Sequence, residues 1–173
     1  MSSDKKLLYI KSGTLGTTKL IEAVMERILR GDINMVVVAS KSGKTAIQLA
    51  AVVKGTVGVI CVSEFTYDDE IKKKMKKMKI VPVEEVNLPF QDNRDMSRAL
   101  NIFGSGVKAA LEVAAVSAEK ELNEGNIIAV AGSGPGLDTA LVVKTSKIED
   151  LSNPDPKKRM SVLEIIAISK RGC

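Results

Sequence analysis

The stretch MVVVASKSGKTAIQLA, residues 35–50, contains a buried strand, a short polar turn and the start of a helix. Its apolar run ends at Ala39 and is rich in β-branched residues, which is typical of a strand covered on both faces of a parallel sheet. After the turn, the helical pattern begins near Thr45. A strand that leads through a turn into a helix is the repeating unit of α/β proteins.

The same alternation extends from this stretch in both directions. It predicts a three-layer α/β/α sandwich with a mostly parallel sheet, in a single domain over residues 1–173. The last three strands lack intervening helices, so we expect an antiparallel edge. Apolar runs predict strands over residues 6–10, 33–40, 57–63, 80–86, 126–132, 139–146 and 161–170. Helical periodicity predicts helices over residues 19–31 (with Thr17 or Thr18 as N-cap), 44–55, 68–79 and 97–125, the last broken at Gly104–Gly106.

The composition excludes several classes of function. The chain has no histidine, which removes Ser–His–Asp and Cys–His catalysis and histidine-ligated metals. Cys61 and Cys173 form no CxxC pair, so we expect one buried thiol, one tail thiol and no metal site. No apolar run reaches the roughly 18 residues of a membrane span, and MSSDKK lacks the apolar centre of a signal peptide. We therefore expect a cytoplasmic protein without a membrane partner.

The positive charge of the chain raises the question of nucleic acid. The net charge is +5, and many lysines lie in IKKKMKKMK, residues 71–79. Ile71, Met75 and Met78 recur at helical spacing, which favours an amphipathic helix with solvated lysines. A nucleic-acid patch is the alternative, but aromatic residues make up only 3% of the chain, so base-stacking platforms are scarce. We expect a phosphorylated small ligand and no nucleic acid.

The turn at residues 40–45 has the end of a nucleotide-binding P-loop but not its beginning. That motif requires a glycine five residues before Gly43, where this chain has Val38 inside the strand. The features of a simpler phosphate site are nevertheless present, because free N–H groups at a helix start attract anions. The alternative is that one hydroxyl of the turn only caps the helix. The hydroxyl groups and charges of the turn belong to Ser40, Lys41, Ser42, Lys44 and Thr45.

A second glycine-rich turn lies in AGSGPGLDTALVV, residues 131–143. Gly132 and Gly134 fit the dinucleotide fingerprint G-x-G-x-x-G, but Leu137 replaces its last glycine and strand-forming residues follow. A plain hairpin would also need these glycines. Both a ligand wall and a hairpin therefore remain as interpretations of this turn.

We expect these turns to meet at one edge of the sheet. Ligands of open α/β sheets bind outside the carboxyl ends of the parallel strands. The segments 12–17, 40–45 and 63–66 each follow a predicted strand, and 132–139 would cover them. The candidate ligand-binding residues are Ser12, Gly13, Thr17, Ser40, Lys41, Ser42, Gly43, Lys44, Thr45, Ser63, Gly132, Ser133, Gly134, Gly136, Asp138 and Thr139.

Two of these motifs, in this order, resemble the C-terminal domain of pyruvate kinase. VVVASKSGKTAIQLA followed by VGVICVSE resembles its phosphate turn, and GSGPGLDTALVV resembles its second effector loop. The similarity runs from about Thr17 to Val143, and the chain looks like the free-standing archaeal proteins with this domain. The resemblance implies a pyruvate kinase C-terminal-like fold and a phosphorylated ligand, with flavin mononucleotide (FMN) the first candidate. It implies no pyruvate kinase activity, because the catalytic barrel is absent.

Two classes of function remain open. The first is a binding protein for a phosphorylated small molecule, and the second is a flavin-dependent oxidoreductase or another small-molecule enzyme. An enzyme would need a proton-transfer group beside the ligand. We also expect a homo-oligomer, whose interface the sequence does not specify. Without histidine, the candidates for proton transfer are Lys11, Glu64, Tyr67, Lys108 and Asp138.

Overall fold

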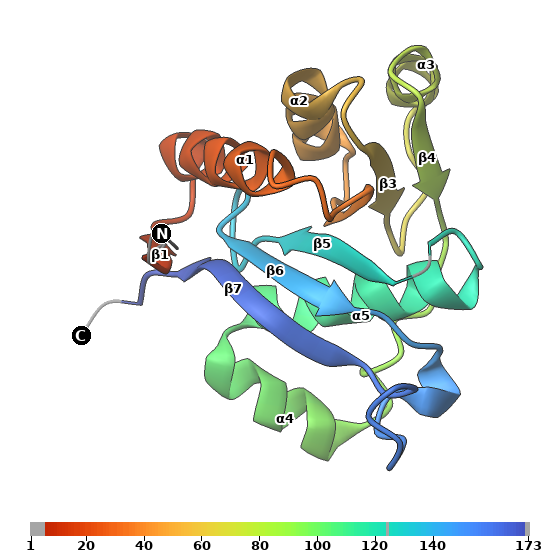
Figure 1. Ribbon diagram of the computed structural model, residues 1–173. Coiled ribbons are helices and arrows are strands. Elements are labelled where there is room, and N and C mark those ends of the chain that lie inside the picture. The colour runs from red at the N-terminus through yellow and green to blue at the C-terminus, as the bar shows by residue number, and fades with distance from the viewer. Residues whose placement is uncertain (1–5, 124, 172–173) are drawn as a thin grey trace.

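Residues 6–123 and 125–171 are described by the computed structural model, and they build one seven-stranded sheet (Figure 1). The order of the strands in the sheet is β1-β7-β6-β5-β2-β3-β4. Their bounds are β1 (Leu8–Ile10), β2 (Met35–Ala39), β3 (Gly58–Val62), β4 (Ile80–Val83), β5 (Asn126–Ala131), β6 (Thr139–Lys144) and β7 (Ser161–Ser169).

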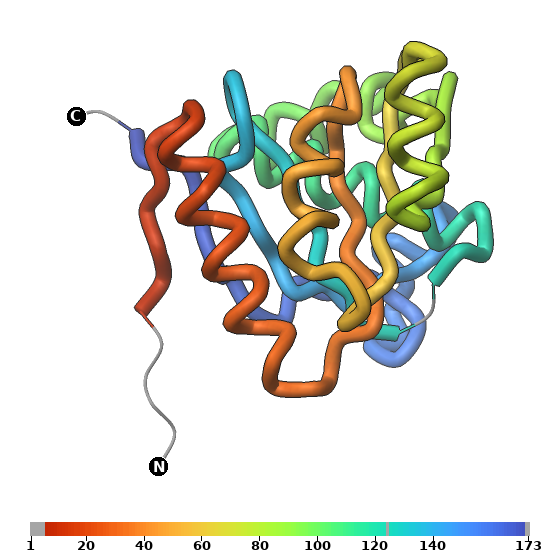
Figure 2. The backbone as a smooth tube through the Cα atoms, turned by 90° about the horizontal axis from the view of Figure 1, so that it is seen from above, coloured from red at the N-terminus to blue at the C-terminus, as the bar shows by residue number. Residues whose placement is uncertain are grey.

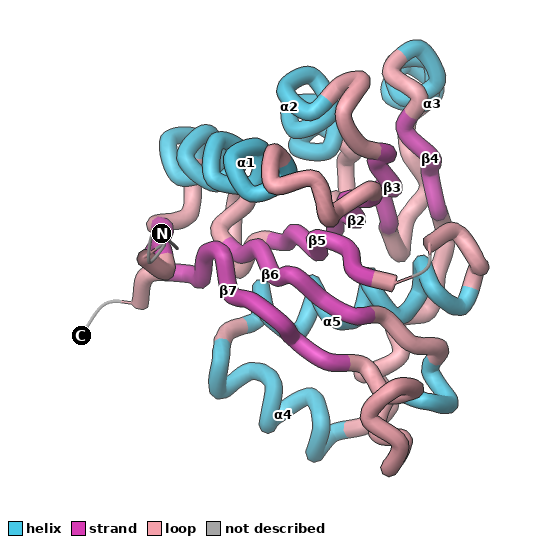
Figure 3. The backbone as a smooth tube through the Cα atoms, in the orientation of Figure 1, coloured by secondary structure: helices cyan, strands magenta, loops and turns pink. Residues whose placement is uncertain are grey.

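Helices cover both faces of this sheet (Figures 1 and 3). The helices α1, α2 and α3 lie on one face, and α4 and α5 lie on the other. The predicted three-layer α/β/α sandwich is therefore confirmed. The bounds are α1 (Thr14–Ile28), α2 (Lys44–Val53), α3 (Asp69–Lys77), α4 (Arg94–Phe103) and α5 (Ser105–Glu119), with a 3-10 turn η1 (Ile148–Asp150) before β7.

The antiparallel pairing lies on one side of the sheet, as expected for its last three strands. β6 pairs antiparallel with both β5 and β7. All other neighbouring strands pair in parallel, including the short edge strand β1 with β7. Without a helix between β5, β6 and β7, the chain has no crossover that could return it in parallel. Pro82 lies in β4, the edge strand opposite to β1, where a missing N–H is tolerated.

One crossover decides where a ligand could bind. After β4 the chain passes beneath the sheet through α4 and α5 and returns as β5 on the far side of β2. β2 therefore has β3 on one side and β5 on the other. The turns that follow β1, β2 and β5 consequently lie along the same edge of the molecule (Figure 2).

The sheet separates two apolar cores. On the first face, Leu20 of α1, Leu49 of α2 and Met75 of α3 are fully buried against the strands. On the second face, α5 is buried from residue 110 through 118, because the sheet covers one side of it and α4 packs beside it. Apolar burial on both faces explains the continuous apolar runs of β2 and β5.

The first helix begins earlier than the sequence predicts. α1 starts at Thr14, so Thr17 lies inside the helix and is not its N-cap. The hydroxyl of Thr17 accepts a hydrogen bond from the amide of Leu137 at 2.9 Å. A Cβ on Gly16 would lie 1.8 Å from the carbonyl oxygen of Lys11, so the helix start packs tightly on the chain before it. Contacts distant in the sequence thus extend the helix through residues with turn-like propensity.

Two predictions about side chains are confirmed. Met75 of α3 is buried while Lys73, Lys74 and Lys76 of the same helix are exposed. Cys61 is a buried free thiol, whereas Cys173 lies outside the described residues. Among the helices of the described residues, none has the length and apolarity to span a membrane.

Candidate functional site

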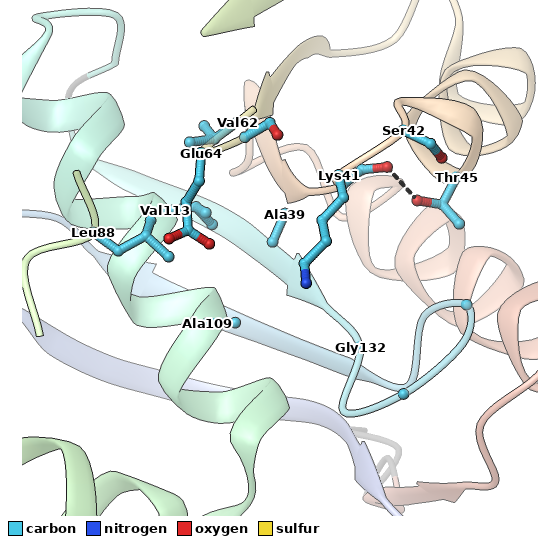
Figure 4. Close-up of a pocket in the computed structure, with 14 residues that line it drawn as sticks. Ala39, Lys41, Ser42, Thr45, Val62, Glu64, Leu88, Ala109, Val113 and Gly132 are labelled. Atoms are coloured by element: carbon cyan, nitrogen blue, oxygen red, sulfur yellow. Dashed lines mark hydrogen bonds between the residues drawn. The ribbon is translucent and has the colours of Figure 1, made fainter. Parts of the chain in front are cut away.

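A cavity of about 340 Å³ lies outside the carboxyl ends of β2, β3 and β5 (Figure 4). β2 leads to α2 on one face and β5 arrives from α5 on the other, so the cavity lies where the topology of the sheet switches. Open α/β sheets bind ligands at this point. The lining residues are Ala39, Ser40, Lys41, Ser42, Thr45, Val62, Ser63, Glu64, Leu88, Ala109, Val113, Gly132, Gly134 and Gly136.

The turn after β2 contains its own hydrogen-bond network. The Ser40 hydroxyl accepts from the Gly43 amide at 3.1 Å and from the Thr45 hydroxyl at 2.9 Å. A hydroxyl has two acceptor lone pairs and one O–H, so Ser40 keeps its hydrogen as a donor. The network therefore leaves Ser40 able to donate to a ligand in the cavity.

Capping of α2 does not account for the hydroxyls of this turn. The N-cap of α2 is Gly43, which has φ +77° and makes no side-chain cap bond. Only a long contact of 3.5 Å joins the Lys44 amide to the Ser42 hydroxyl. The amides of a first helical turn have no intrahelical acceptor and carry the positive end of the helix dipole. The start of α2 can therefore receive an anion from the cavity.

Residues from α3 and the segment before it hold this turn from behind. A Cβ on Gly43 would lie 2.4 Å from the terminal methyl of Met75 and 2.8 Å from Ile71, so glycine alone fits here. The phenol of Tyr67, just before α3, donates to the Ser40 carbonyl at 3.0 Å. The direction of the turn is thus set by packing and by one hydrogen bond.

A buried thiol completes this support. The sulfur of Cys61 lies 3.0 Å from the Tyr67 hydroxyl, and both side chains are buried. The phenol gives its one hydrogen to Ser40, so the thiol is the donor of this contact. Burial raises the pKa of Cys61 to about 12 and also raises the pKa of Tyr67 above its ordinary value. Both groups are therefore neutral at physiological pH and serve the packing of the turn.

The glycine turn after β5 is organised by Asp138. Its buried carboxylate accepts from the Ser133 amide at 3.1 Å, from the Ser133 hydroxyl at 2.5 Å and from the Thr139 hydroxyl at 2.8 Å. Gly106 of α5 packs on the same pair, because a Cβ there would lie 2.3 Å from the Thr139 hydroxyl oxygen. Asp138 and Thr139 therefore shape the turn, and neither lines the cavity.

The turn after β1 lies behind the glycine turn. The Gly13 amide donates to the Pro135 carbonyl at 2.9 Å. The Ser12 side chain lies beside Gly134, where a Cβ would be 3.6 Å from the Ser12 hydroxyl oxygen. These contacts fix the glycine turn without placing the β1 turn on the cavity surface.

The predicted site residues thus divide equally between the cavity wall and the layer behind it. The residues that line the cavity are Ser40, Lys41, Ser42, Thr45, Ser63, Gly132, Gly134 and Gly136. The residues that do not line it are Ser12, Gly13, Thr17, Gly43, Lys44, Ser133, Asp138 and Thr139.

Sequence reasoning missed the apolar wall of the cavity. This wall comes from Leu88 in the loop after β4 and from Ala109 and Val113 of α5. The buried Glu112 holds the loop in place, since its carboxylate accepts from the Phe90 amide at 3.2 Å. No local pattern marks these residues, because they reach the cavity only through the crossover beneath the sheet.

Among the five candidates for proton transfer, Glu64 alone lines the cavity. Tyr67 and Asp138 are buried, and their polar atoms form the hydrogen bonds described above. Lys108 forms an ion pair of 3.2 Å with the buried carboxylate of Glu112. Lys11 is exposed at the end of β1. In the described part of the chain, no three histidine, cysteine, aspartate or glutamate side chains are grouped so as to hold a metal ion.

No protein-family model matches this chain. The resemblance to the C-terminal domain of pyruvate kinase therefore stays a prediction. The function is argued below from the cavity itself.

Proposed function

We propose that this chain binds a phosphorylated small molecule in the cavity at the ends of β2, β3 and β5, with FMN as the first candidate. The observation that carries the proposal is the joining of two unlike walls in one cavity. One wall is the Ser/Gly turn at the start of α2, and the other is the apolar surface formed by α5 and Leu88. A phosphate group attached to an apolar or aromatic body matches both walls.

The polar wall supports the phosphate end. Ser40 has a hydroxyl hydrogen to donate, and Ser42 adds a second hydroxyl at the cavity. Lys41 adds a positive charge to the lining, and its ammonium lies 5.8 Å from the centre of the Phe65 ring. Together with the free amides at the start of α2, these groups form an anion site of the kind found at helix N-termini.

The apolar wall supports a ring system at the other end. Ala39, Val62, Leu88, Ala109 and Val113 line this side, and the alanines leave room for a flat group. The cavity volume of about 340 Å³ lies within the usual range for small-molecule sites, roughly 300–1,000 Å³. The residues present therefore fit FMN, whose phosphate and flat ring need a polar and an apolar wall.

An enzyme is the second candidate function, and Glu64 is the observation that favours it. A flavin-dependent oxidoreductase, or another small-molecule enzyme, needs a proton donor or acceptor at the ligand. Two observations support Glu64 for that role: it lines the cavity, and its carboxylate points toward the apolar wall (Figure 4). A bound flavin would supply the redox chemistry. No pyruvate kinase activity is expected.

The other proposed partner is a second copy of the chain. Three large side chains are exposed at the β1 and α4 end of the molecule: Tyr9 at 66%, Ile102 at 74% and Phe103 at 59%. They line one shallow cavity together with Ile168, and burial of such a patch stabilises association. No nucleic acid is proposed as a partner, and a cytoplasmic location stays a prediction.

The experiment that tests the proposed function is ligand binding by the double variant Ser40→Ala/Ser42→Ala. Calorimetric titration with inorganic phosphate and fluorescence titration with FMN measure the two affinities. Loss of charged hydrogen bonds at this turn should weaken both at least about tenfold. The visible spectrum of the purified protein tests FMN independently, since a bound flavin absorbs in the blue.

The matched control is Thr18→Ala, which removes an exposed hydroxyl of α1 far from the cavity lining. It should leave both affinities unchanged. Equal affinities in the wild type and in the double variant would refute the phosphate site. Absence of any phosphate or FMN binding to the wild type would refute the proposed function as a whole.

A further inference from the structure

The cavity holds one carboxylate, and it belongs to Glu64. This residue follows β3 by two positions, and Figure 4 shows its side chain directed toward Leu88 and Val113, away from the turn at Ser42. Lys41 is the other charged side chain of the described lining, and in Figure 4 it extends from the turn into the middle of the cavity, away from Ser42 and Thr45. The two ends of the cavity therefore differ in their polar groups, with hydroxyls at the start of α2 and a carboxylate beside the apolar wall.

The bonding of Glu64 leaves it able to accept from a ligand. The side-chain amide of Gln91 donates to Oε1 of Glu64. Among the described residues, no protein donor reaches Oε2. An ionised carboxylate only accepts hydrogen bonds, and its two oxygens together offer about four acceptor sites. The amide of Gln91 holds the carboxylate in position and leaves an acceptor at the cavity.

From this arrangement we infer that Glu64 selects the class of ligand, which is a monophosphate whose far end carries an N–H or O–H donor. The inference rests on the proposed function, because it assumes that the phosphate lies at the start of α2. A donor at the far end would make a charge-assisted hydrogen bond with Glu64. A second phosphate or a carboxylate at that end would be repelled by the like charge and would lose its hydration without compensation.

This class does not include bisphosphates, which carry a second phosphate at the far end. A bisphosphate needs donors or cations at both ends of its site. Among the described residues, the far end has Glu64, Leu88, Ala109 and Val113, whose side chains supply no donor for a second phosphate when Glu64 is ionised. FMN belongs to the inferred class, because its ring carries one N–H, at N3, flanked by two carbonyl groups.

The test compares three probes: inorganic phosphate, FMN and FMN methylated at N3. Wild type should bind FMN about tenfold more tightly than the N3-methyl compound, since only FMN has a ring N–H to donate to Glu64. Glu64→Gln and Glu64→Ala should reduce this ratio to within about twofold of one. Binding of inorganic phosphate should be the same in all three proteins, because it occupies only the α2 end. Glu85→Gln, which removes a charge nearby but outside the cavity lining, should retain the wild-type ratio.

The results separate this inference from the proposed function. If the ratio of the FMN affinity to the N3-methyl FMN affinity is the same in Glu64→Ala as in the wild type, the inference is overturned. Phosphate binding would still support the proposed function in that case. Binding of phosphate without any binding of FMN also overturns the inference, because no N–H donor then reaches Glu64. Failure of the wild type to bind either phosphate or FMN overturns the proposed function itself. Melting temperatures of the Glu64 variants exclude unfolding as the cause of a lost ratio.

Discussion

The Tyr67 phenol donates a hydrogen bond of 3.0 Å to the backbone carbonyl of Ser40. This bond joins the segment before α3 to the first residue of the turn that borders the cavity. A carbonyl engaged behind the turn cannot point its negative end into the cavity. The amides and hydroxyls of the turn are then the groups that an anion meets.

Tyr67→Phe removes a single hydroxyl group, but it should weaken the binding of phosphate. The variant keeps the buried ring and removes the hydroxyl that donates to Ser40 and accepts from Cys61. We expect a loss of about 1 kcal/mol in stability and a several-fold loss in affinity for inorganic phosphate. Tyr9→Phe, at an exposed tyrosine, is the control and should change neither. Unchanged phosphate affinity in Tyr67→Phe would show that the turn keeps its direction without this bond.

Gly43→Ala and Gly55→Ala separate backbone strain from packing. Both glycines have nearly the same left-handed φ, +77° and +79°. An added Cβ at Gly55 meets no atom within 4 Å, whereas at Gly43 it would lie 2.4 Å from Met75. Gly55→Ala should cost about 1 kcal/mol in the free energy of unfolding. Gly43→Ala should cost clearly more and should also weaken phosphate binding. Equal losses in the free energy of unfolding, measured by chemical denaturation, would contradict the tight packing of α3 on the turn.

Thr139→Val should lower the stability of the fold more than it lowers the affinity for the ligand. Its buried hydroxyl donates to Asp138, and valine keeps the shape while it removes that donor. A buried carboxylate that loses one of its donors costs about 1–3 kcal/mol. The sequence analysis placed Thr139 among the candidate ligand-binding residues, and a ligand contact would give weaker binding with little change in melting temperature. A calorimetric melting curve decides between the two, with the exposed Thr18→Val as control.

The ion pair between Arg27 and Asp32 should make stability depend on pH at the acid end. The buried guanidinium donates two hydrogen bonds to Asp32, at 2.5 and 2.9 Å, and this lowers the pKa of the carboxyl group. The unfolded-state pKa of aspartate is about 3.9, so the pair stabilises the fold above that pH and its contribution is lost as pH falls through the lower folded-state value.

Between pH 5 and pH 3, wild type should consequently lose more stability than Asp32→Asn, measured by urea unfolding. The carboxyl groups that do not share Arg27 titrate in both proteins and cancel in the comparison, whereas Glu164 also bonds to Arg27. Parallel pH profiles of the two proteins would show that the pair contributes nothing to this dependence.

Cys61 should resist alkylation in the native protein. Its thiol is fully buried, and burial raises its pKa to about 12, so the reactive thiolate is nearly absent at pH 8. In a Cys173→Ser variant, iodoacetamide should label no thiol in the native state and one thiol in urea. Rapid labelling of the native variant, detected by mass spectrometry, would contradict the burial of the Cys61 thiol.

Local sequence patterns were sufficient for the order of the helices and strands and for the layers of the fold. The apolar runs of β2, β3 and β5 are continuous because both faces of these strands are covered, and that pattern is visible in the sequence. The spacing of Ile71 and Met75 in α3, and of Met78 just after it, identified the face of this helix that packs on the core. The composition of the Ser40–Thr45 segment marked it as a turn at a strand end, since short polar residues stand between two apolar elements.

The arrangement of the candidate site depended on contacts between residues far apart in the chain. The extent of α1 was not predictable, because Thr17 is held by Leu137. Asp138 and Thr139 were interpreted as ligand contacts, but their polar atoms bond to each other and to Ser133 behind the cavity wall. The sequence by itself determined the residue types that could bind a phosphate. Only the tertiary structure decided which of them reach the cavity and that Glu64 and α5 face them, because the crossover that brings β5 beside β2 leaves no periodic signal in the sequence.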